Sequence, residues 1–209
     1  MKTKTRSQID KVSSLSKIIE DFNVSRNVFI LFVDLCDSTS FKQFCLENEI
    51  PDTTWILRQQ TFLSRTAQLI KDYDGSVVKT IGDEIMATFP VEADPKNILL
   101  CCFEACNLFN GLKSYNKGKF KIKLKAAIDV GSCYDGCIID NQIFDPIGTC
   151  VDRCARIAKF ANTNTVVFSK SFFDILKEKN PDSVYNEIES LSENLKGLGD
   201  VEFFRMVLS

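Results

Sequence analysis

Two aspartates in this chain stand at points where a fold can hold a carboxylate rigidly. Asp34 ends an apolar run at 27–34, and Asp83 follows Gly82 between two short apolar segments. The run predicts a buried central strand with an acid at its carboxyl end, and the Gly-Asp pair predicts a hairpin tip. Carboxylates on neighbouring strands suit Mg²⁺ or Mn²⁺, which bind a few carboxylates together with substrate phosphates. Each acid alone is also a common turn former, so the argument depends on the pair.

The chain contains no histidine. A Ser-His-Asp triad, a Cys-His pair and a histidine-liganded metal are therefore excluded. Any chemistry must rest on carboxylates, lysines, arginines and cysteines.

Nine cysteines are present, an odd number, and residues 1–10 are polar and charged. Both features argue against a secreted disulfide framework and favour reduced thiols. A structural zinc site is the alternative, because Cys133 and Cys137, and also Cys150 and Cys154, are spaced CxxxC. Zinc sites more often use CxxC, and several of these cysteines lie in apolar patterns, so we expect buried thiols.

The overall charge is nearly balanced, with 26 Lys and Arg against 28 Asp and Glu. No basic field of the kind that binds nucleic acid or anionic membranes is present. The longest apolar stretch, 98–109, is interrupted by Glu104 and is shorter than the roughly 20 residues of a membrane helix. With no apolar signal segment at its start, the chain is predicted to be cytoplasmic, bound neither to membrane nor to nucleic acid.

Apolar patterning predicts an α+β chain. Strands are predicted at 27–34, 76–81, 84–89, 120–130, 165–168 and within 195–208, and helices at 38–47, 52–72, 94–115, 147–160 and 170–179. A turn is predicted at 134–136. This order is typical of a ferredoxin-like or palm-type sandwich, with helices packed on one face of a mostly antiparallel sheet.

Two parts of the chain are predicted. Residues 1–26 have apolar side chains at helical spacing, which predicts an amphipathic helix that packs on the rest of the chain or on a second copy. Residues 27–209 contain no repeat, low-complexity tract or linker and therefore predict one domain.

Four motifs resemble the signatures of the class III adenylyl and guanylyl cyclase catalytic domain. They are FVDLCDST at 32–39, KTIGDEIMATF at 79–89, DPIGTCVDRCAR at 145–156 and KGLG at 196–199. The resemblance covers about 27–208 in the family's order. It implies the class III cyclase fold and the conversion of a nucleoside triphosphate to a 3′,5′-cyclic nucleotide and pyrophosphate.

The resemblance also implies roles for particular residues. Asp34 and Asp83 would hold two Mg²⁺ or Mn²⁺ ions per site, with the Leu35 carbonyl as a further ligand. Arg156 would stabilise the α-phosphate in the transition state. Asp152 is a departure, because the family usually has an asparagine here that orients the ribose. An ionised aspartate can only accept hydrogen bonds, so Asp152 either accepts from a ribose hydroxyl or is not a ligand.

Two lysines match positions that contact phosphate in the family. Lys125 stands where an arginine often binds phosphate, and Lys196 would hold the triphosphate end. Both are also explained as exposed strand charges. Leu198 replaces a second lysine that is frequent in the last motif, which would weaken phosphate binding there.

Lys79 and Asp145 match the two positions that read the base in adenylyl cyclases. A lysine donor beside an aspartate acceptor suits adenine, cytosine or, in reversed order, uracil, and makes GTP the least favoured substrate. The chain also resembles small bacterial cyclases of anti-phage systems, which make cyclic UMP or cyclic CMP. Arg65, or alternatively Arg58, would then fill the space of a purine's second ring. We favour a pyrimidine triphosphate, with ATP as the alternative.

In this family the metal acids come from one subunit and the base-reading and transition-state residues from the other. Because one chain here carries both sets, the resemblance implies a homodimer with composite active sites. A non-catalytic, nucleotide-binding homologue is the main alternative, and Asp152 is the feature that favours it. A diguanylate cyclase or polymerase palm shares the strand and helix order but has no counterpart of the motif at 145–156.

Overall fold

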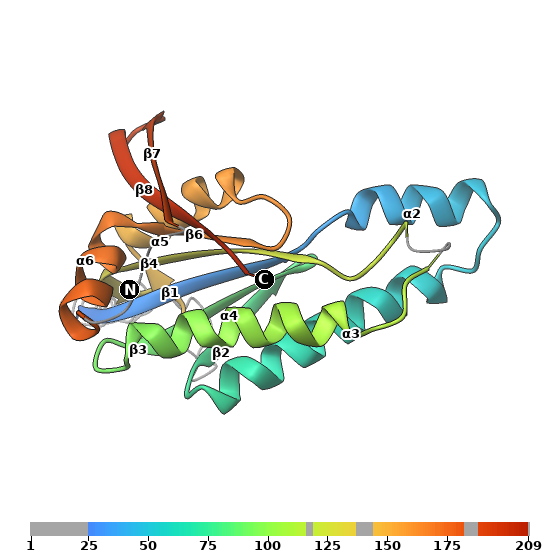
Figure 1. The fold of residues 1–209 in the computed structure, drawn as a ribbon, viewed down its shortest axis with the longest axis horizontal. Coiled ribbons are helices and arrows are strands. Elements are labelled where there is room, and N and C mark those ends of the chain that lie inside the picture. Colours follow the sequence, from blue (N-terminus) through green and yellow to red (C-terminus); the bar gives the residue numbers. More distant parts are fainter. Residues whose placement is uncertain (1–24, 116–118, 137–143, 182–187, 209) are drawn as a thin grey trace, which may run out of the picture.

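The computed structural model describes residues 25–115, 119–136, 144–181 and 188–208 (Figure 1). The helix predicted within 1–26 therefore lies almost wholly outside the described residues.

One mixed sheet forms the centre of the fold, in the order β2-β3-β1-β4-β6-β8-β7, with β5 paired to β4. Its strands are β1 Arg26–Leu35, β2 Ser76–Ile81, β3 Glu84–Pro90, β4 Leu124–Asp135, β5 Pro146–Ile147, β6 Thr165–Ser169, β7 Ile188–Leu195 and β8 Gly199–Val207. β4 and β6 run parallel, while β1, β2 and β3 pair antiparallel. The mostly antiparallel α+β architecture is thereby confirmed.

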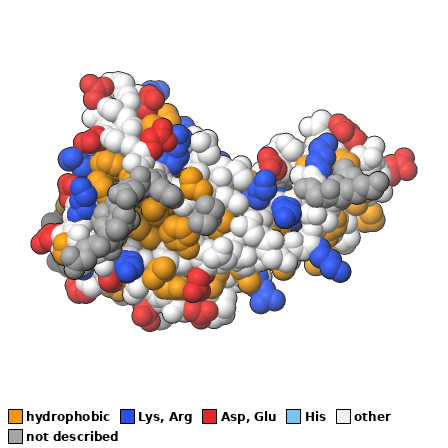
Figure 2. Space-filling model, in the orientation of Figure 1, with side chains coloured by type: hydrophobic (Ala, Val, Ile, Leu, Met, Phe, Trp, Pro, Cys, Tyr) orange, Lys and Arg blue, Asp and Glu red, His pale blue; other side chains and the backbone are white. Residues whose placement is uncertain are grey.

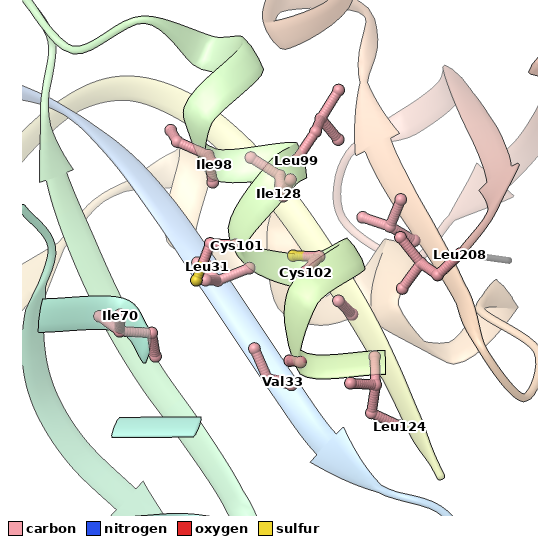
Figure 3. Close-up of a cluster of buried hydrophobic side chains, with 14 of the residues drawn as sticks. Leu31, Val33, Ile70, Ile98, Leu99, Cys101, Cys102, Leu124, Ile128 and Leu208 are labelled. Atoms are coloured by element: carbon pink, nitrogen blue, oxygen red, sulfur yellow. The ribbon is translucent and has the colours of Figure 1, made fainter. Parts of the chain in front are cut away.

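Helices cover both faces of the sheet, so the prediction of helices on one face was wrong. They are α2 Ser38–Glu47, α3 Thr53–Asp72, α4 Pro95–Asn110, α5 Thr149–Ile157 with the 3₁₀ turn Ala158–Phe160, and α6 Lys170–Lys179. α3, α4 and α6 pack on the face that carries Phe29 and Leu31, whereas α5 packs on the face of Ile30 and Phe32. The reason is that β1 is buried along most of its length on both faces. Figure 3 shows α4 lying over Leu31, Val33 and Ile128.

A small lobe formed by α2 and the start of α3 extends from the body (Figure 1). It has its own cluster of buried side chains, Phe41, Cys45 and Phe120. The β7–β8 hairpin projects at the other end of the molecule, and Figure 2 shows a saddle between the hairpin and the lobe.

Three boundaries differ from the prediction for tertiary reasons. β4 runs to Asp135, into the predicted turn at 134–136, because Tyr134 and Asp135 pair with β5. The same pairing uses Pro146 and Ile147, so α5 begins at Thr149. β7 has a polar sequence, IESLSENL, which gives no strand signal, and it forms by pairing with β8. None of the helices in the described residues is long and apolar enough to cross a membrane.

Candidate active site

Three charged side chains form a row across the middle of the sheet. Asp34 on β1 is paired in register with Glu84 on β3 and with Lys125 on β4. The Lys125 Nζ lies 2.9 Å from the Asp34 Oδ2. Asp83 precedes Glu84 in the turn between β2 and β3, as the sequence predicted. The turn depends on Gly82, whose φ of 66° is in the left-handed region.

The row carries more negative than positive charge. Burial raises the pKa of Asp34, and the charge of Asp83 adds to the increase, while Lys125 opposes it. Burial raises the pKa of Glu84 to about 7, and the neighbouring charge of Asp34 contributes to that increase. A divalent cation would relieve this repulsion, so the donor set fits Mg²⁺ or Mn²⁺.

The ligands that the resemblance implies are two carboxylates, those of Asp34 and Asp83, and one main-chain oxygen. Leu35, whose carbonyl would be the third ligand, is the last residue of β1 and has a buried side chain. Within the described part of the chain, no three Cys, Asp or Glu side chains form a ready-made metal cluster. Substrate phosphates would have to complete the coordination, which is usual for Mg²⁺.

A cavity of about 230 Å³ opens beside Asp34 on the face covered by α5. Its lining residues are Phe32, Asp34, Glu84, Lys125, Ala126, Ala127, Ala155, Ala158 and Lys159. Sequence reasoning missed Glu84 and Lys159. The alternation of β3 would have found Glu84, because it shares a face with Met86. The volume is below the roughly 300–1,000 Å³ of typical ligand pockets.

Lys79 and Asp145 form a separate pair. The Lys79 Nζ donates to both Asp145 carboxylate oxygens, at 2.8 and 2.7 Å. Asp145 is held by its own main chain, because its N–H donates to Asp135 Oδ1 and its carbonyl accepts from Gly136. Neither Lys79 nor Asp145 lines the cavity at Asp34. The structure therefore brings together the two base-reading candidates, but away from that cavity.

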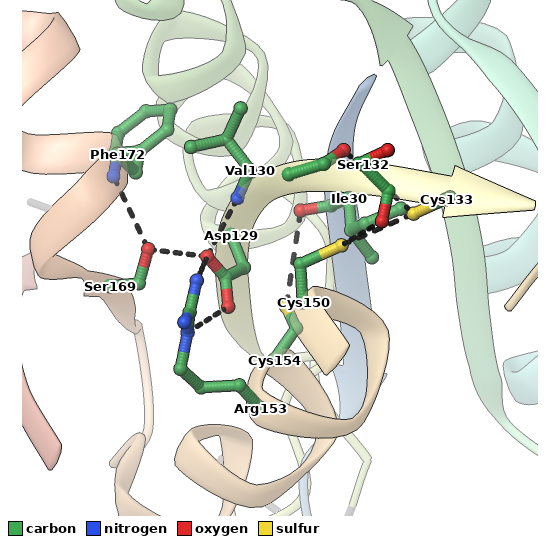
Figure 4. A network of polar contacts seen from close by, with 11 residues as sticks. Ile30, Asp129, Val130, Ser132, Cys133, Cys150, Arg153, Cys154, Ser169 and Phe172 are labelled. Atoms are coloured by element: carbon green, nitrogen blue, oxygen red, sulfur yellow. Dashed lines mark hydrogen bonds and ion pairs between the residues drawn. The ribbon is translucent and has the colours of Figure 1, made fainter. Parts of the chain in front are cut away.

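Arg156 and Asp152 lie one turn apart on α5, with Asp152 exposed and Arg156 half-buried. An ion pair with a fully buried carboxylate anchors this helix to the sheet, because Arg153, which is 25% exposed, donates twice to Asp129 on β4, at 2.7 and 2.8 Å. Figure 4 shows Ser169 and the N–H of Val130 on the same carboxylate. This network fixes the position of α5 on the sheet, and therefore that of Asp152 and Arg156.

The family profile described as "Adenylate and Guanylate cyclase catalytic domain" matches residues 21–206. The chain belongs to this family. Comparison with curated protein sequences finds no match.

Solved cyclase domains share the fold. The guanylate cyclase domain of RhGC from Catenaria anguillulae, in complex with GTP, is 14% identical, with a TM-score of 0.70 over 87% of this chain and 97% of that one. A non-canonical dimeric guanylyl cyclase domain from Blastocladiella emersonii is 12% identical, with a TM-score of 0.67 over 88% and 97%. A Trypanosoma brucei adenylate cyclase in its monomeric state is 16% identical, with a TM-score of 0.70 over 86% and 87%. At these identities the likeness shows the fold alone.

Two expected site residues of this cyclase domain lie elsewhere. Lys196 is exposed in the β7–β8 turn, at the opposite edge of the sheet from β2 and Lys79. Arg65 is exposed on α3, which packs on the other face of the sheet from α5. Within one chain, the structure does not bring either residue to the base-reading pair.

Arg58, the alternative pocket-filling residue, is 3% exposed and has a different role. Its Nη2 donates to the carbonyls of Cys36 and Lys121, both at 3.0 Å. The prediction that Arg58 limits the base pocket was therefore wrong, because the side chain is buried and its Nη2 holds two main-chain carbonyls inside the protein.

The cysteines of the cyclase domain that the structure describes are free and buried. Cys133 and Cys150 approach each other to 3.1 Å between their sulfurs, and Cys154 faces the Ile30 carbonyl. Cys137 lies outside the described residues. The expectation of buried thiols is confirmed for the others, and no zinc-binding group is present among the described residues.

Proposed function

We propose that this domain converts a nucleoside triphosphate to a 3′,5′-cyclic nucleotide and pyrophosphate, with two divalent ions held by Asp34, Asp83 and the Leu35 carbonyl. The observation that supports it most is the row of Asp34, Glu84 and Lys125 beside the Asp83 turn. The carboxylates there repel one another, and the lysine offers a cation to phosphate.

The reaction needs the ribose 3′-oxygen to attack the α-phosphorus while the bond to pyrophosphate breaks. Bound Mg²⁺ or Mn²⁺ would lower the pKa of the attacking hydroxyl and neutralise charge on the phosphates. Lys125 would turn from Asp34 to a substrate phosphate. Arg156 would donate to the α-phosphate as negative charge builds up there, and Asp152 would accept from a ribose hydroxyl. Lys196 would bind the triphosphate end.

We further propose that each site is shared by two copies of the chain. The small cavity at Asp34 supports this, because neither Lys79 nor Asp145 lines it, so the metal acids and the base-reading pair of one chain do not share a cavity. Mixing Asp83→Ala chains with Arg156→Ala chains should restore part of the activity, since a heterodimer contains one site with neither substitution. No recovery despite demonstrated subunit exchange would contradict shared sites.

For the base, we propose a pyrimidine triphosphate, with ATP as the second candidate. Asp152 in place of the usual asparagine, and the resemblance to anti-phage cyclases, support the pyrimidine and extend the proposal to a second messenger in antiviral defence. The direct Lys79–Asp145 pair supports any base with an acceptor beside an exocyclic amine, which includes adenine as well as cytosine.

The test is to incubate the protein with ATP, GTP, CTP and UTP together with Mn²⁺ and to identify cyclic products by mass. We expect cyclic UMP or cyclic CMP. Faster turnover of ATP at equal concentration would return the chain to the adenylyl cyclases. No product from any triphosphate, from a protein shown to be dimeric, would favour a non-catalytic homologue. Lys79→Ala should lower kcat/KM for the preferred nucleotide by roughly ten- to a hundredfold.

A further inference from the structure

Two neighbouring residues of α3 hold the main chain beside the two metal carboxylates, one at the turn after β1 and one at the β2–β3 turn. Arg58 Nη2 donates to the carbonyl of Cys36, directly after Asp34 and Leu35, at 3.0 Å. Gln59 Nε2 donates to the carbonyl of Gly82, directly before Asp83, also at 3.0 Å. One helix turn thus contacts both turns through main-chain oxygens that do not belong to the carboxylates.

The turn after β1 is held from two sides. Arg58 is almost wholly buried, with its guanidinium carbon 5.0 Å from the centre of the Phe41 ring. The same Nη2 also donates to the Lys121 carbonyl, and the N–H of Cys36 donates to the Lys123 carbonyl at 2.9 Å. Arg58 therefore ties the turn to the segment that leads into β4, so the direction of the neighbouring Leu35 carbonyl is restricted.

The hairpin tip at Gly82 has little packing of its own. Gly82 is exposed, and a Cβ placed on it would meet nothing within 4 Å. Its carbonyl can only accept, so the amide of Gln59 must present its nitrogen. Oε1 of Gln59 is then buried with no partner among the described residues. An unpaired buried acceptor is unfavourable, so the amide orientation that serves Gly82 leaves the other end of the Gln59 side chain unsatisfied.

We propose that Arg58 and Gln59 are positioning residues. By holding the turn after β1 and the β2–β3 turn, they set the distance between Asp34 and Asp83, and so set the affinity for the divalent ion without contacting it. This inference rests on the proposed metal site. Asp34 and Asp83 repel each other in the absence of a cation. A brace on both turns keeps them close enough to share one ion, and residues that orient metal ligands typically contribute ten- to a hundredfold to metal affinity.

Gln59→Met tests the brace, with Gln60→Met as the matched control. Methionine keeps the length of the side chain and removes its donor, and Gln60 is exposed on the same helix. Mn²⁺ binding to the protein is measured from the electron paramagnetic resonance signal of free Mn²⁺. The Mn²⁺ affinity should fall about tenfold in Gln59→Met and stay unchanged in Gln60→Met. The KM for nucleotide at saturating Mn²⁺ should not change in either variant.

Arg58 needs a conservative variant because Arg58→Met removes the donor to the Cys36 and Lys121 carbonyls and places the stability of the lobe at risk. Arg58→Lys keeps the charge and one donor, so its Mn²⁺ affinity should fall between those of the wild type and Gln59→Met, with the thermal midpoint largely preserved. Equal Mn²⁺ affinity in Gln59→Met and Gln60→Met would overturn the inference.

Asp83→Ala separates this inference from the proposed function. If Asp83→Ala loses Mn²⁺ binding while Gln59→Met keeps it, the positioning role of Arg58 and Gln59 is refuted and the metal site is retained. Unchanged Mn²⁺ binding in Asp83→Ala would refute the proposed metal site itself, and with it the positioning role that depends on that site.

Discussion

Two aspartates on the same face of the sheet each pair with a basic side chain, but they differ in burial and in the number of hydrogen bonds that they accept. Asp129 on β4 is fully buried and accepts four hydrogen bonds, from Val130 N, Arg153 Nε and Nη2, and Ser169 Oγ (Figure 4). Asp34 on β1 is 26% exposed, has Lys125 on one oxygen and lies beside Glu84 and Asp83.

The difference lies in unused hydrogen-bonding capacity. Three of the donors to Asp129 are on Oδ1 and one is on Oδ2, and the side chain is 0% exposed, so this carboxylate is enclosed by protein donors and closed to a ligand. Asp34 keeps free positions and like-charged neighbours, which is the state in which a carboxylate gains most from a metal ion. Full burial among several protein donors indicates a structural carboxylate, whereas partial exposure beside like charges indicates a binding site.

The largest effect is expected at the structural pair. Asp129→Ala leaves the Arg153 guanidinium without its carboxylate. A fully buried unpaired charge costs about 3–5 kcal/mol, and because Arg153 is 25% exposed we expect about 2–3 kcal/mol. The free energy of unfolding in urea should fall by that amount. A loss below about 1 kcal/mol would mean that the network does not anchor α5 as we describe.

Asp34→Ala should act on activity and leave the fold intact. Cyclisation should fall at least about a hundredfold, because charge stabilisation of the phosphates is lost. The thermal midpoint should stay the same or rise, since one of several repelling carboxylates is gone. Asp83→Ala should behave alike, and more than a tenth of wild-type activity in both variants would argue against the two-metal assignment.

Replacing both partners of the buried pair sharpens the comparison. Asp129→Leu combined with Arg153→Met should cost less than about 2 kcal/mol, since an apolar pair of similar size leaves no charge unpaired. Arg153→Met alone should cost more than the double variant. Urea unfolding of the three proteins measures the coupling, and additive losses would show that the two residues do not act as a pair.

The smallest effect on stability is expected at the Lys79–Asp145 ion pair, which is more exposed than the pairs of Asp129 and Asp34. Its side chains are 44% and 32% exposed, and such pairs contribute about 0–1 kcal/mol. Lys79→Met should leave the thermal midpoint within the error of the wild type while changing kcat/KM. A loss of stability comparable to that of Asp129→Ala would assign this pair to the fold instead of the site.

Local signals were sufficient for the elements with clear patterns. The helix predicted at 170–179 is α6 residue for residue, because Ser169 caps it with a hydrogen bond from the Phe172 N–H. The strands predicted at 76–81 and 84–89 form the hairpin around Gly82, whose left-handed conformation the Gly-Asp pair indicates. Polar β7 could not be predicted, since its strand state comes from its partner β8.

The arginines of α3 show where sequence reasoning failed. Arg58 and Arg65 stand on a helix whose pattern shows that it is amphipathic, but the pattern does not say which groups the buried face will meet. In the fold Arg58 lies against two carbonyls and the Phe41 ring, and Arg65 is exposed on the far side of the sheet from α5. The contacts of a long side chain depend on segments distant in sequence.

The sequence by itself determined that Asp34 would end a buried strand and that Asp83 would lie at a hairpin tip, because runs of apolar residues and Gly-Asp turns act over a few neighbouring residues. Only the tertiary structure decided what surrounds them. The registers of β1 with β3 and β4 bring Glu84 and Lys125 beside Asp34, and α3 places Arg58 and Gln59 on the two turns. These neighbours are 24 to 91 residues from Asp34 along the chain. Strand registers and helix positions result from packing the whole core, so no local pattern contains them.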